Sequence, residues 1–282
     1  MASGDLQGTA PMKEEMQQRW TANATGWRTV RAEHSATSRA ATEAIVEAAA
    51  LRPGMQVLDL ASGTGQPCLA LAERVGPAGQ VTATDLVPDM LAGAEEAAAA
   101  QGLTNLTFQQ ADAEALPFPD QSFDVVTCRF GAMSSPNLRQ ALAEIYRVLK
   151  PGGRVALVVW GPLAENPHTA ILHELLRKYG QDPSRIGFQL GQSGLLLEAL
   201  RTAGFQQVQE EQRRIPWPVP GPLEHLWTER QARSAEMRRC IAALPPEQQD
   251  HLRAEVLSAL APYHDGEQAN FTATMIVAAA VR

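Results

Sequence analysis

The residues best suited to chemistry in this chain are two glycines and an aspartate, each at the end of a predicted strand. The segment VLDLASGTGQ, residues 57–66, runs from an apolar stretch directly into Gly63 and Gly65. Glycines at such a turn let a ligand approach the main chain, and the following helix presents free N–H groups. Asp85 ends the next predicted strand, where a carboxylate accepts hydrogen bonds from a ribose diol. The pattern therefore predicts a crevice that holds an adenosine-type ligand.

The same turn indicates which adenosine-type ligand to expect. Residues 63–68 read GTGQPC and lack the third glycine of the dinucleotide fingerprint G-x-G-x-x-G. Asp59 precedes the turn, and its carboxylate would repel a pyrophosphate but would suit an ammonium group, directly or through water. These features favour a sulfonium amino-acid nucleoside over a nicotinamide dinucleotide.

Alternating strands and helices must position these residues. Short apolar runs predict strands, and apolar residues at helical spacing, with Pro and Gly at the ends, predict helices. Regular alternation of this kind favours a parallel sheet with right-handed crossovers, and its apolar strands fit a sheet covered on both faces. We expect strands at residues 56–61, 80–85, 106–112, 123–130 and 154–160, and helices at 12–32, 38–50, 67–75, 87–102 and 137–149.

The pattern is looser after residue 160. Helices are expected at 168–180 and at 193–204, the second capped by Ser193 and ended by Gly204. A long polar strand, paired antiparallel, follows at 205–215, and we expect PWPVPGP to interrupt all regular structure. Residues 223–262 read as helices, and 271–282 as a final strand.

Four ordered segments carry a family resemblance. They are VLDLASGTGQ, VTATDLVPDML, QQADAEALPFPDQSFDVVTCRFG and EIYRVLKPGGRVALVVW, with weaker agreement at LLLEALRTAGF. With them, residues 45–160 resemble the class I S-adenosylmethionine (SAM) methyltransferases, above all the ubiquinone/menaquinone C-methyltransferase-like group (methyltransferase type 11).

The resemblance implies an α/β, Rossmann-like fold. Its seven-stranded sheet would be mostly parallel, with helices on both faces, an antiparallel last strand and a helical cap. We expect a tail and helical cap at residues 1–36, a SAM-binding core at 37–160 and a C-terminal half at 161–282 that completes the sheet. A helical insert at about 218–268 would cover the substrate.

The resemblance also implies site residues, with SAM as cofactor and S-adenosylhomocysteine as product. The methionine part would lie against Asp59, Ala61, Gly63, Thr64 and Gly65. Asp85 would bind the ribose, and the adenine would lie against Leu86, Met90, Asp112 and Ala113. Arg129 would also contact the cofactor, and with Phe130 and Met133 it would lie where the substrate meets the methyl group. In quinone-modifying members a small polar residue usually stands at the position of Arg129, so this position departs from their pattern.

Methyl transfer from a sulfonium is an in-line displacement, which requires a positioned nucleophile and excluded water but no metal. His34, in the N-terminal segment, is the candidate base, and Arg129 is a second catalytic candidate. The other histidines are scattered and predict no metal site: His168, His173, His225, His251 and His264. Cys68, Cys128 and Cys240 form no cluster and are expected to be buried and inert.

Tryptophans indicate how the substrate is enclosed. Trp20 and Trp27 lie two turns apart on the N-terminal helix and predict an aromatic cap. Trp217 and Trp227 either form a second cover or only pack the insert onto the core. A closed, apolar pocket would suit a small, weakly polar acceptor such as a phenol, a quinone-like ring or an isoprenoid, methylated at carbon or oxygen. A thiol or an amine acceptor remains an alternative.

Composition limits the partners. The 282 residues carry a net charge of −7, which disfavours nucleic acid and anionic membranes. The first residues lack the apolar core of a signal peptide, no run is long enough to span a bilayer, and the cysteines suit a reducing compartment. We expect a cytoplasmic monomer or homodimer. Other functions on such a sheet are a nicotinamide-dependent oxidoreductase and a SAM-binding protein without catalysis.

Overall fold

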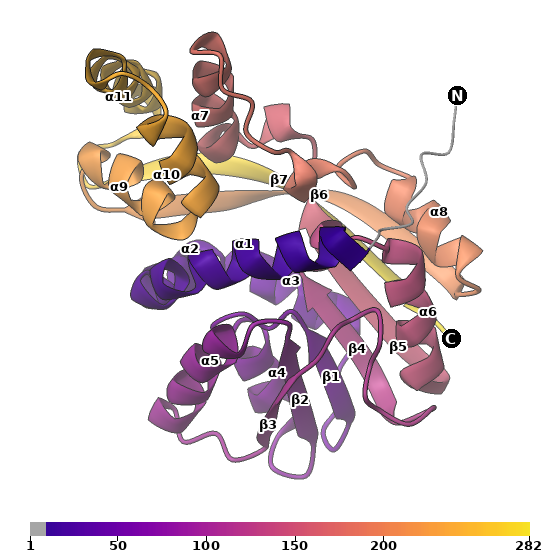
Figure 1. Cartoon of the computed structure of the whole chain (residues 1–282). Coiled ribbons are helices and arrows are strands. Elements are labelled where there is room, and N and C mark those ends of the chain that lie inside the picture. The colour runs from indigo at the N-terminus through magenta and orange to yellow at the C-terminus, as the bar shows by residue number, and fades with distance from the viewer. Residues whose placement is uncertain (1–9) are drawn as a thin grey trace.

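One seven-stranded sheet runs through the molecule (Figure 1). The computed structural model describes residues 10–282, so most of the predicted N-terminal tail lies outside the described residues. The strand order is β3-β2-β1-β4-β5-β7-β6, and β7 alone runs against its neighbours β5 and β6. The strands are β1 (Gln56–Leu60), β2 (Gln80–Asp85), β3 (Leu106–Gln110), β4 (Phe123–Arg129), β5 (Leu149–Trp160), β6 (Gln206–Pro220) and β7 (Gln268–Val281).

Helices cover both faces of this sheet, as expected from its apolar strands. On one face the buried residues come from α3 (Arg39–Ala49), α4 (Cys68–Val75) and α5 (Pro88–Ala100). On the other they come from α6 (Leu138–Val148) and α8 (Leu195–Thr202). Val57 and Leu58, neighbours in β1, are both fully buried, one in each cluster. The predicted Rossmann-like sheet is confirmed, including its antiparallel last strand.

A second group of helices lies over the carboxyl-end side of the parallel strands. α1 (Ala10–Thr29) and α2 (Arg31–Thr37) precede the sheet, and α7 (Pro167–Lys178), α9 (Leu223–Arg233), α10 (Ala235–Ala242) and α11 (Pro246–Leu260) follow it. Figure 1 shows α1 as a bar between the strands and the orange helices α9 and α10. At Gly26 a Cβ would lie 1.7 Å from the carbonyl oxygen of Ala232, so only glycine lets α1 pack this closely on α9. Short 3-10 turns are η1 (Ala132–Ser134), η2 (Leu163–Glu165), η3 (Ile186–Phe188) and η4 (Ala261–Tyr263).

The expected break at PWPVPGP is wrong. β6 continues to Pro220, and it is the edge strand of the sheet. Its prolines stand at alternate positions, 216, 218 and 220, so their nitrogens all face the open edge, where no ladder hydrogen bond is lost. The cover insert therefore cannot begin at residue 218, since the next helix starts at Leu223.

Two smaller expectations also differ. Ser193 does not cap α8; Gly194 is the N-cap residue, and the Ser193 hydroxyl donates to Glu210 instead. Residues 150–153, expected as a turn, lie within the bounds of β5, where its register with β4 shifts. Among the described residues, no helix combines the length and apolar character needed to cross a bilayer.

Candidate functional site

The turn after β1 has a backbone that only special residues adopt easily. Gly63 and Gly65 have φ angles of +56° and +120°, in the region that favours glycine. Ala61 has φ +52° although it carries a Cβ. Phe130, just after β4, shares this feature with φ +59°. Strained backbone of this kind concentrates at functional sites, and here it lies at the carboxyl ends of two adjacent strands.

Asp85, the last residue of β2, is tied to this turn. Its Oδ2 accepts a hydrogen bond of 3.0 Å from the N–H of Gly63, and its Oδ1 accepts one of 3.0 Å from Val87. Burial raises the pKa of Asp85, and the backbone N–H donors lower it. Each carboxylate oxygen keeps a lone pair for a further donor, because a carboxylate offers about four acceptor positions. The carboxylate is thus oriented toward the cavity and can accept from a diol.

Asp59 lies beneath the turn and does not line the cavity. It is fully buried, its Oδ1 accepts from the Thr127 hydroxyl at 2.6 Å, and its Oδ2 accepts from the Ser62 hydroxyl at 2.7 Å. Burial raises the pKa of Asp59 to about 6, against the lowering effect of these two hydroxyls. The carboxylate joins β1, β4 and the turn, and from this position any contact with a ligand would run through water.

Asp112 follows β3 and lines the same cavity as Arg129. Its Oδ1 accepts from the N–H of Glu114 at 2.8 Å, and its Oδ2 accepts from Lys13 Nζ at 3.0 Å. Lys13 also lies 2.6 Å from Glu114, whose side chain is only 3% exposed. Glu114 in turn accepts from the Ser135 hydroxyl and the Asn137 N–H. A lysine on α1 therefore closes over the two acids that follow β3.

Arg129, the last residue of β4, has a buried guanidinium. Its Nη1 donates to the Ser38 carbonyl and the Thr42 hydroxyl, and its Nη2 donates to the Gln66 carbonyl at 3.1 Å. Its Nε has no partner. Burial lowers the pKa of Arg129 to about 10, so the guanidinium stays charged at neutral pH.

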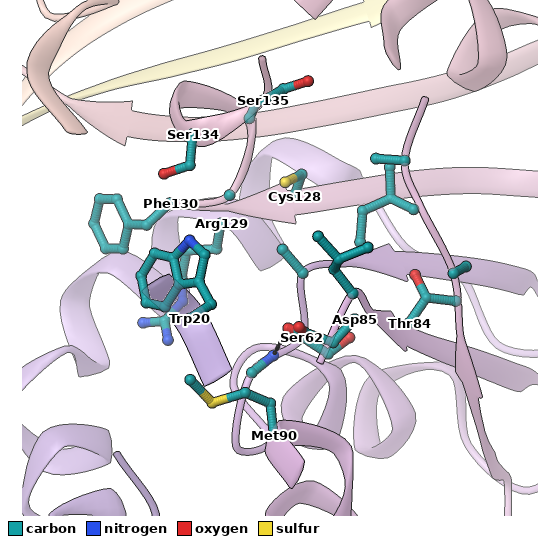
Figure 2. A pocket seen from close by; sticks show the side chains of 18 of the residues that line it. Trp20, Ser62, Thr84, Asp85, Met90, Cys128, Arg129, Phe130, Ser134 and Ser135 are labelled. Atoms are coloured by element: carbon teal, nitrogen blue, oxygen red, sulfur yellow. Dashed lines mark hydrogen bonds between the residues drawn. The ribbon is translucent and has the colours of Figure 1, made fainter. Parts of the chain in front are cut away.

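These residues surround one cavity of about 210 Å³. Figure 2 shows Asp85 and Thr84 on one side of the view and Arg129, Phe130 and Trp20 on the other. The wall near Arg129 is aromatic: Trp20 and Trp27 lie 6.4 Å apart between ring centroids, and Trp27 meets His34 edge-on at 4.6 Å. The Phe130 ring stacks on Trp160 at 4.0 Å. The cavity is thus acidic at one end and aromatic and basic at the other.

Most of the predicted site residues lie together in this lining. His34 is among them, and burial holds its pKa well below the usual value, so the imidazole is neutral. Gly65 and Met133 are not in the lining, nor is Asp59: Gly65 shapes the turn, and Met133 is buried in η1. The residues that do line the cavity are Trp20, Trp27, His34, Ala61, Gly63, Thr64, Asp85, Leu86, Met90, Asp112, Ala113, Arg129 and Phe130.

Trp217 and Trp227 do not line this cavity. Trp217 is 1% exposed, and both indoles line a smaller void between β6, α7, α9 and α11. They pack the C-terminal helices onto the sheet. Of the two roles expected for Trp217 and Trp227, this is the packing role rather than a second cover of the substrate. All three cysteines are buried and unpaired, as expected, and burial raises the pKa of Cys128 to about 12. The described residues contain no group of three side chains that could hold a metal.

The sequence pattern missed some residues of the cavity lining, and also Lys13, which lies outside the lining and bonds to Asp112. Lys13 and Asp112 are 99 residues apart, and no local pattern pairs them. Arg31 and Gln66 also line the cavity, from α2 and from the turn after β1. Gln66 stands inside the glycine motif VLDLASGTGQ, so the sequence could have indicated it as a site residue. Lys13 and Arg31 stand in no motif that could have indicated them.

Residues 57–153 match the family model described as Methyltransferase domain. This domain covers β1 to the first part of β5, which includes Gly63, Asp85, Asp112 and Arg129. The resemblance stated from the four sequence segments is confirmed.

One curated relative is similar to this chain over about half of its length. The ubiquinone/menaquinone biosynthesis C-methyltransferase UbiE of Shewanella pealeana is 42% identical over 134 residues, which are 47% of this chain and 50% of that one. The chain thus spans about half the length of the curated relatives it matches, and the C-terminal half lies outside the matched family model.

Solved structures share the fold over most of the chain. The YcgJ protein of Bacillus subtilis is 24% identical with a TM-score of 0.58, over 86% of this chain and 98% of that one. The phosphoethanolamine N-methyltransferase 2 of Haemonchus contortus, in complex with S-adenosyl-L-methionine, is 23% identical with a TM-score of 0.55, over 86% and 52%. At these identities the likeness establishes the fold.

Proposed function

We propose that this chain is a SAM-dependent methyltransferase that acts on a small molecule. The observation that supports it most is the crevice at the carboxyl ends of β1 and β2, where the Gly63 N–H and the Asp85 carboxylate meet inside a methyltransferase domain. A carboxylate held this way accepts hydrogen bonds from ribose hydroxyls. The N-methyltransferase of similar fold was solved with S-adenosyl-L-methionine, which agrees with this cofactor.

The cavity residues suit such a cofactor along its length. Asp85 would hold the ribose, Leu86 and Met90 would contact the adenine, and Asp112 would accept from the adenine amino group with Ala113 beside it. Ala61, Gly63 and Thr64 would lie against the methionine part. Gly65 and Asp59 would act from outside the lining, by shaping the turn and by holding it to β4.

For the reaction itself, SAM supplies an electrophilic methyl group on a sulfonium. The protein's part is to orient the acceptor and exclude water. Trp20 and Trp27, on α1, cover the cavity, and Phe130 is fixed by its stack on Trp160. His34 is neutral and can accept a proton, but burial makes it a weak base. An acceptor that needs little base assistance, such as an electron-rich carbon or an acidic hydroxyl, fits this site best.

The acceptor should have an apolar, unsaturated body, because rings of Trp20, Trp27, His34 and Phe130 line its end of the cavity. A phenol, a quinone-like ring or an isoprenoid would satisfy this lining, with transfer to carbon or oxygen. The UbiE relative is named as a C-methyltransferase of quinone biosynthesis, which supports carbon as the acceptor atom. We also propose a cytoplasmic protein, monomeric or homodimeric, that does not bind nucleic acid.

Calorimetry with S-adenosylhomocysteine tests the cofactor site. The wild type should bind it, and Asp85→Ala should weaken binding at least ~10-fold, because hydrogen bonds to a charged group are worth about 1.5–3 kcal/mol. Asp124→Ala is the matched control: this aspartate is the second residue of β4, at the amino end of the parallel strands, and pairs with Lys150.

Two results would reject the proposal. One is the absence of S-adenosylhomocysteine binding by folded wild-type protein. The other is equal affinity in the Asp85→Ala variant, the Asp124→Ala variant and the wild type, which would remove Asp85 from the ribose role. Release of S-adenosylhomocysteine from SAM in the presence of acceptor separates an enzyme from a binding protein.

A further inference from the structure

The guanidinium of Arg129 is a buried cation without a carboxylate in contact. Arg129 is 8% exposed, and no carboxylate of the described residues lies within salt-bridge distance of it. The acid that acts on it from nearby, Asp59, has its oxygens occupied by Ser62 and Thr127. A buried cation of this kind is costly unless something pairs with it.

The hydrogen bonds of Arg129 leave part of its donor set unused. A guanidinium has five N–H donors, and Ser38, Thr42 and Gln66 accept three of them. The two that remain are on Nε, which is buried without a partner, and on Nη2. Two N–H groups of one guanidinium are the donors that a carboxylate engages in a bidentate pair.

A second buried donor lines the same end of the cavity. Trp27 Nε1 has no acceptor, although the indole lies in the lining. The carboxamide oxygen of Gln66 also lacks a partner, but it is neutral and cannot balance a charge. The aromatic end of the cavity therefore carries a positive charge and two unpaired donors, Arg129 Nε and Trp27 Nε1, which are covered in this structure and would reach a ligand oxygen only after a small side-chain shift.

The proposed cofactor does not cancel this charge. Besides its carboxylate, SAM carries an ammonium and a sulfonium, so it is a net cation. Arg31, a second guanidinium in the lining, has only the Gly93 carbonyl as a hydrogen-bond acceptor. With SAM bound, its carboxylate would be the one anion left for two guanidinium groups, because the acids of the lining, Asp85, Asp112 and Glu114, are engaged by the Gly63 turn and by Lys13.

We propose that the methyl acceptor is an unsaturated or aromatic carboxylic acid, and that Arg129 binds its carboxylate. This inference rests on the proposed function and narrows its acceptor class: the body is apolar, and one end is anionic. The cation–π contact of Arg129 with Phe130, 5.6 Å from guanidinium carbon to ring centroid, keeps the guanidinium beside the aromatic wall that would hold the body. Arg129 is then a specificity-determining residue.

Binding of simple acids tests this without the natural substrate. Benzoate, cinnamate and salicylate are titrated into the protein saturated with S-adenosylhomocysteine, each beside its neutral amide. For at least one pair, the wild type should prefer the acid by ~10-fold or more, the range expected for a charge-assisted pair. Arg129→Met should abolish the preference, and Arg129→Lys should restore part of it. Arg154→Met, which removes a guanidinium that bonds to the Ala48 carbonyl outside the lining, is the control and should leave it in place.

The carboxylate of the cofactor could bind Arg129 in place of the substrate carboxylate. A second pair of ligands distinguishes these two partners. S-adenosylhomocysteine has this carboxylate and 5′-methylthioadenosine lacks it. If Arg129→Met weakens the first and spares the second, Arg129 binds the cofactor and the substrate assignment is overturned. It is also overturned if the wild type prefers no acid over its amide, or if the preference survives in Arg129→Met.

Failure of this inference is distinguishable from failure of the proposed function. If the wild type binds S-adenosylhomocysteine but no acid, the proposed methyltransferase function stands and the acidic acceptor is rejected. If the wild type does not bind S-adenosylhomocysteine, both the methyltransferase function and the acidic acceptor are rejected. Retained S-adenosylhomocysteine or methylthioadenosine binding by the Arg129 variants shows that they are folded.

Discussion

At the scale of single residues, burying the Asp59 carboxylate lowers the stability of the fold when that carboxylate is charged. Its carboxylate is buried in the sheet, and two hydroxyl donors only partly compensate for the lost hydration. What the molecule gains is a fixed turn, since Ser62 and Thr127 are held by one side chain. The acid before the glycines thus acts on the ligand crevice through geometry rather than by contact.

This cost predicts a pH dependence. The folded pKa of Asp59, about 6, is above its ordinary value of 3.8, so the folded state binds the proton more tightly. The group therefore stabilises the fold at low pH, and this contribution is lost as the pH rises from about 4 to about 6. The free energy of unfolding of the wild type, relative to Asp59→Asn, should fall by ~3 kcal/mol from about pH 4 to about pH 7.

Denaturant melts at several pH values measure this difference. Asp124→Asn is the control with the opposite sign, because Lys150 and the Gln56 N–H, against some desolvation, lower the pKa of Asp124. The wild type should gain stability relative to that variant as the pH rises. A difference between the wild type and Asp59→Asn that does not change with pH would show that Asp59 has an ordinary pKa.

At the scale of elements, α1 ties the two halves of the molecule together above the cavity. Lys13 bonds to Asp112 and Glu114 after β3, and Arg19 bonds to Glu236 on α10. Trp20 and Trp27, which follow these contacts along α1, line the cavity. The entry of a ligand therefore depends on how firmly this helix is held.

Removing the Lys13 contact should loosen α1. Lys13→Met should speed amide hydrogen exchange across Ala10–Thr29 by roughly 2- to 5-fold, since a partly exposed ion pair contributes about 1 kcal/mol or less. Lys150→Met is the control, because Lys150 is equally exposed, at 38%, and pairs with Asp124 away from α1. Equal exchange in α1 for both variants would mean that Lys13 does not hold the helix.

At the scale of the whole molecule, β6 shows how the sheet ends. An exposed edge strand presents free N–H groups to other chains, and proline removes them. The side chains of Ile215, Trp217 and Val219 are buried, whereas the prolines between them are exposed or half-buried. The strand thus keeps its inner face apolar and its outer edge without donors.

Replacing these prolines should expose the edge. A Pro216→Thr, Pro218→Thr, Pro220→Thr variant should form more high-mass species than the wild type in light scattering after size exclusion, because each threonine adds an unpaired N–H to the edge. Pro246→Ala, at the start of α11, is the control. An unchanged mass distribution would show that the prolines do not protect this edge.

Sequence and structure agree where the information is local. Gly63 and Gly65 follow an apolar strand, and this order alone predicts the turn; Asp85 follows by the same reasoning. PWPVPGP misled because three prolines in five residues usually exclude a strand, and only the position of β6 at the sheet edge makes them harmless. The resemblance placed Asp59 and Met133 among the site residues; both are buried and lie outside the cavity lining, Asp59 in β1 and Met133 in η1.

The sequence by itself determined the alternating strands and helices, the crevice and the residues that edge it, because strand periodicity and turn chemistry depend on near neighbours. Tertiary structure decided the rest. That Lys13 reaches Asp112, that Arg129 is buried without a counter-charge, and that Trp217 packs the core rather than the cavity all depend on contacts between residues far apart in the chain. Such contacts are set by how whole layers pack, which no local pattern records.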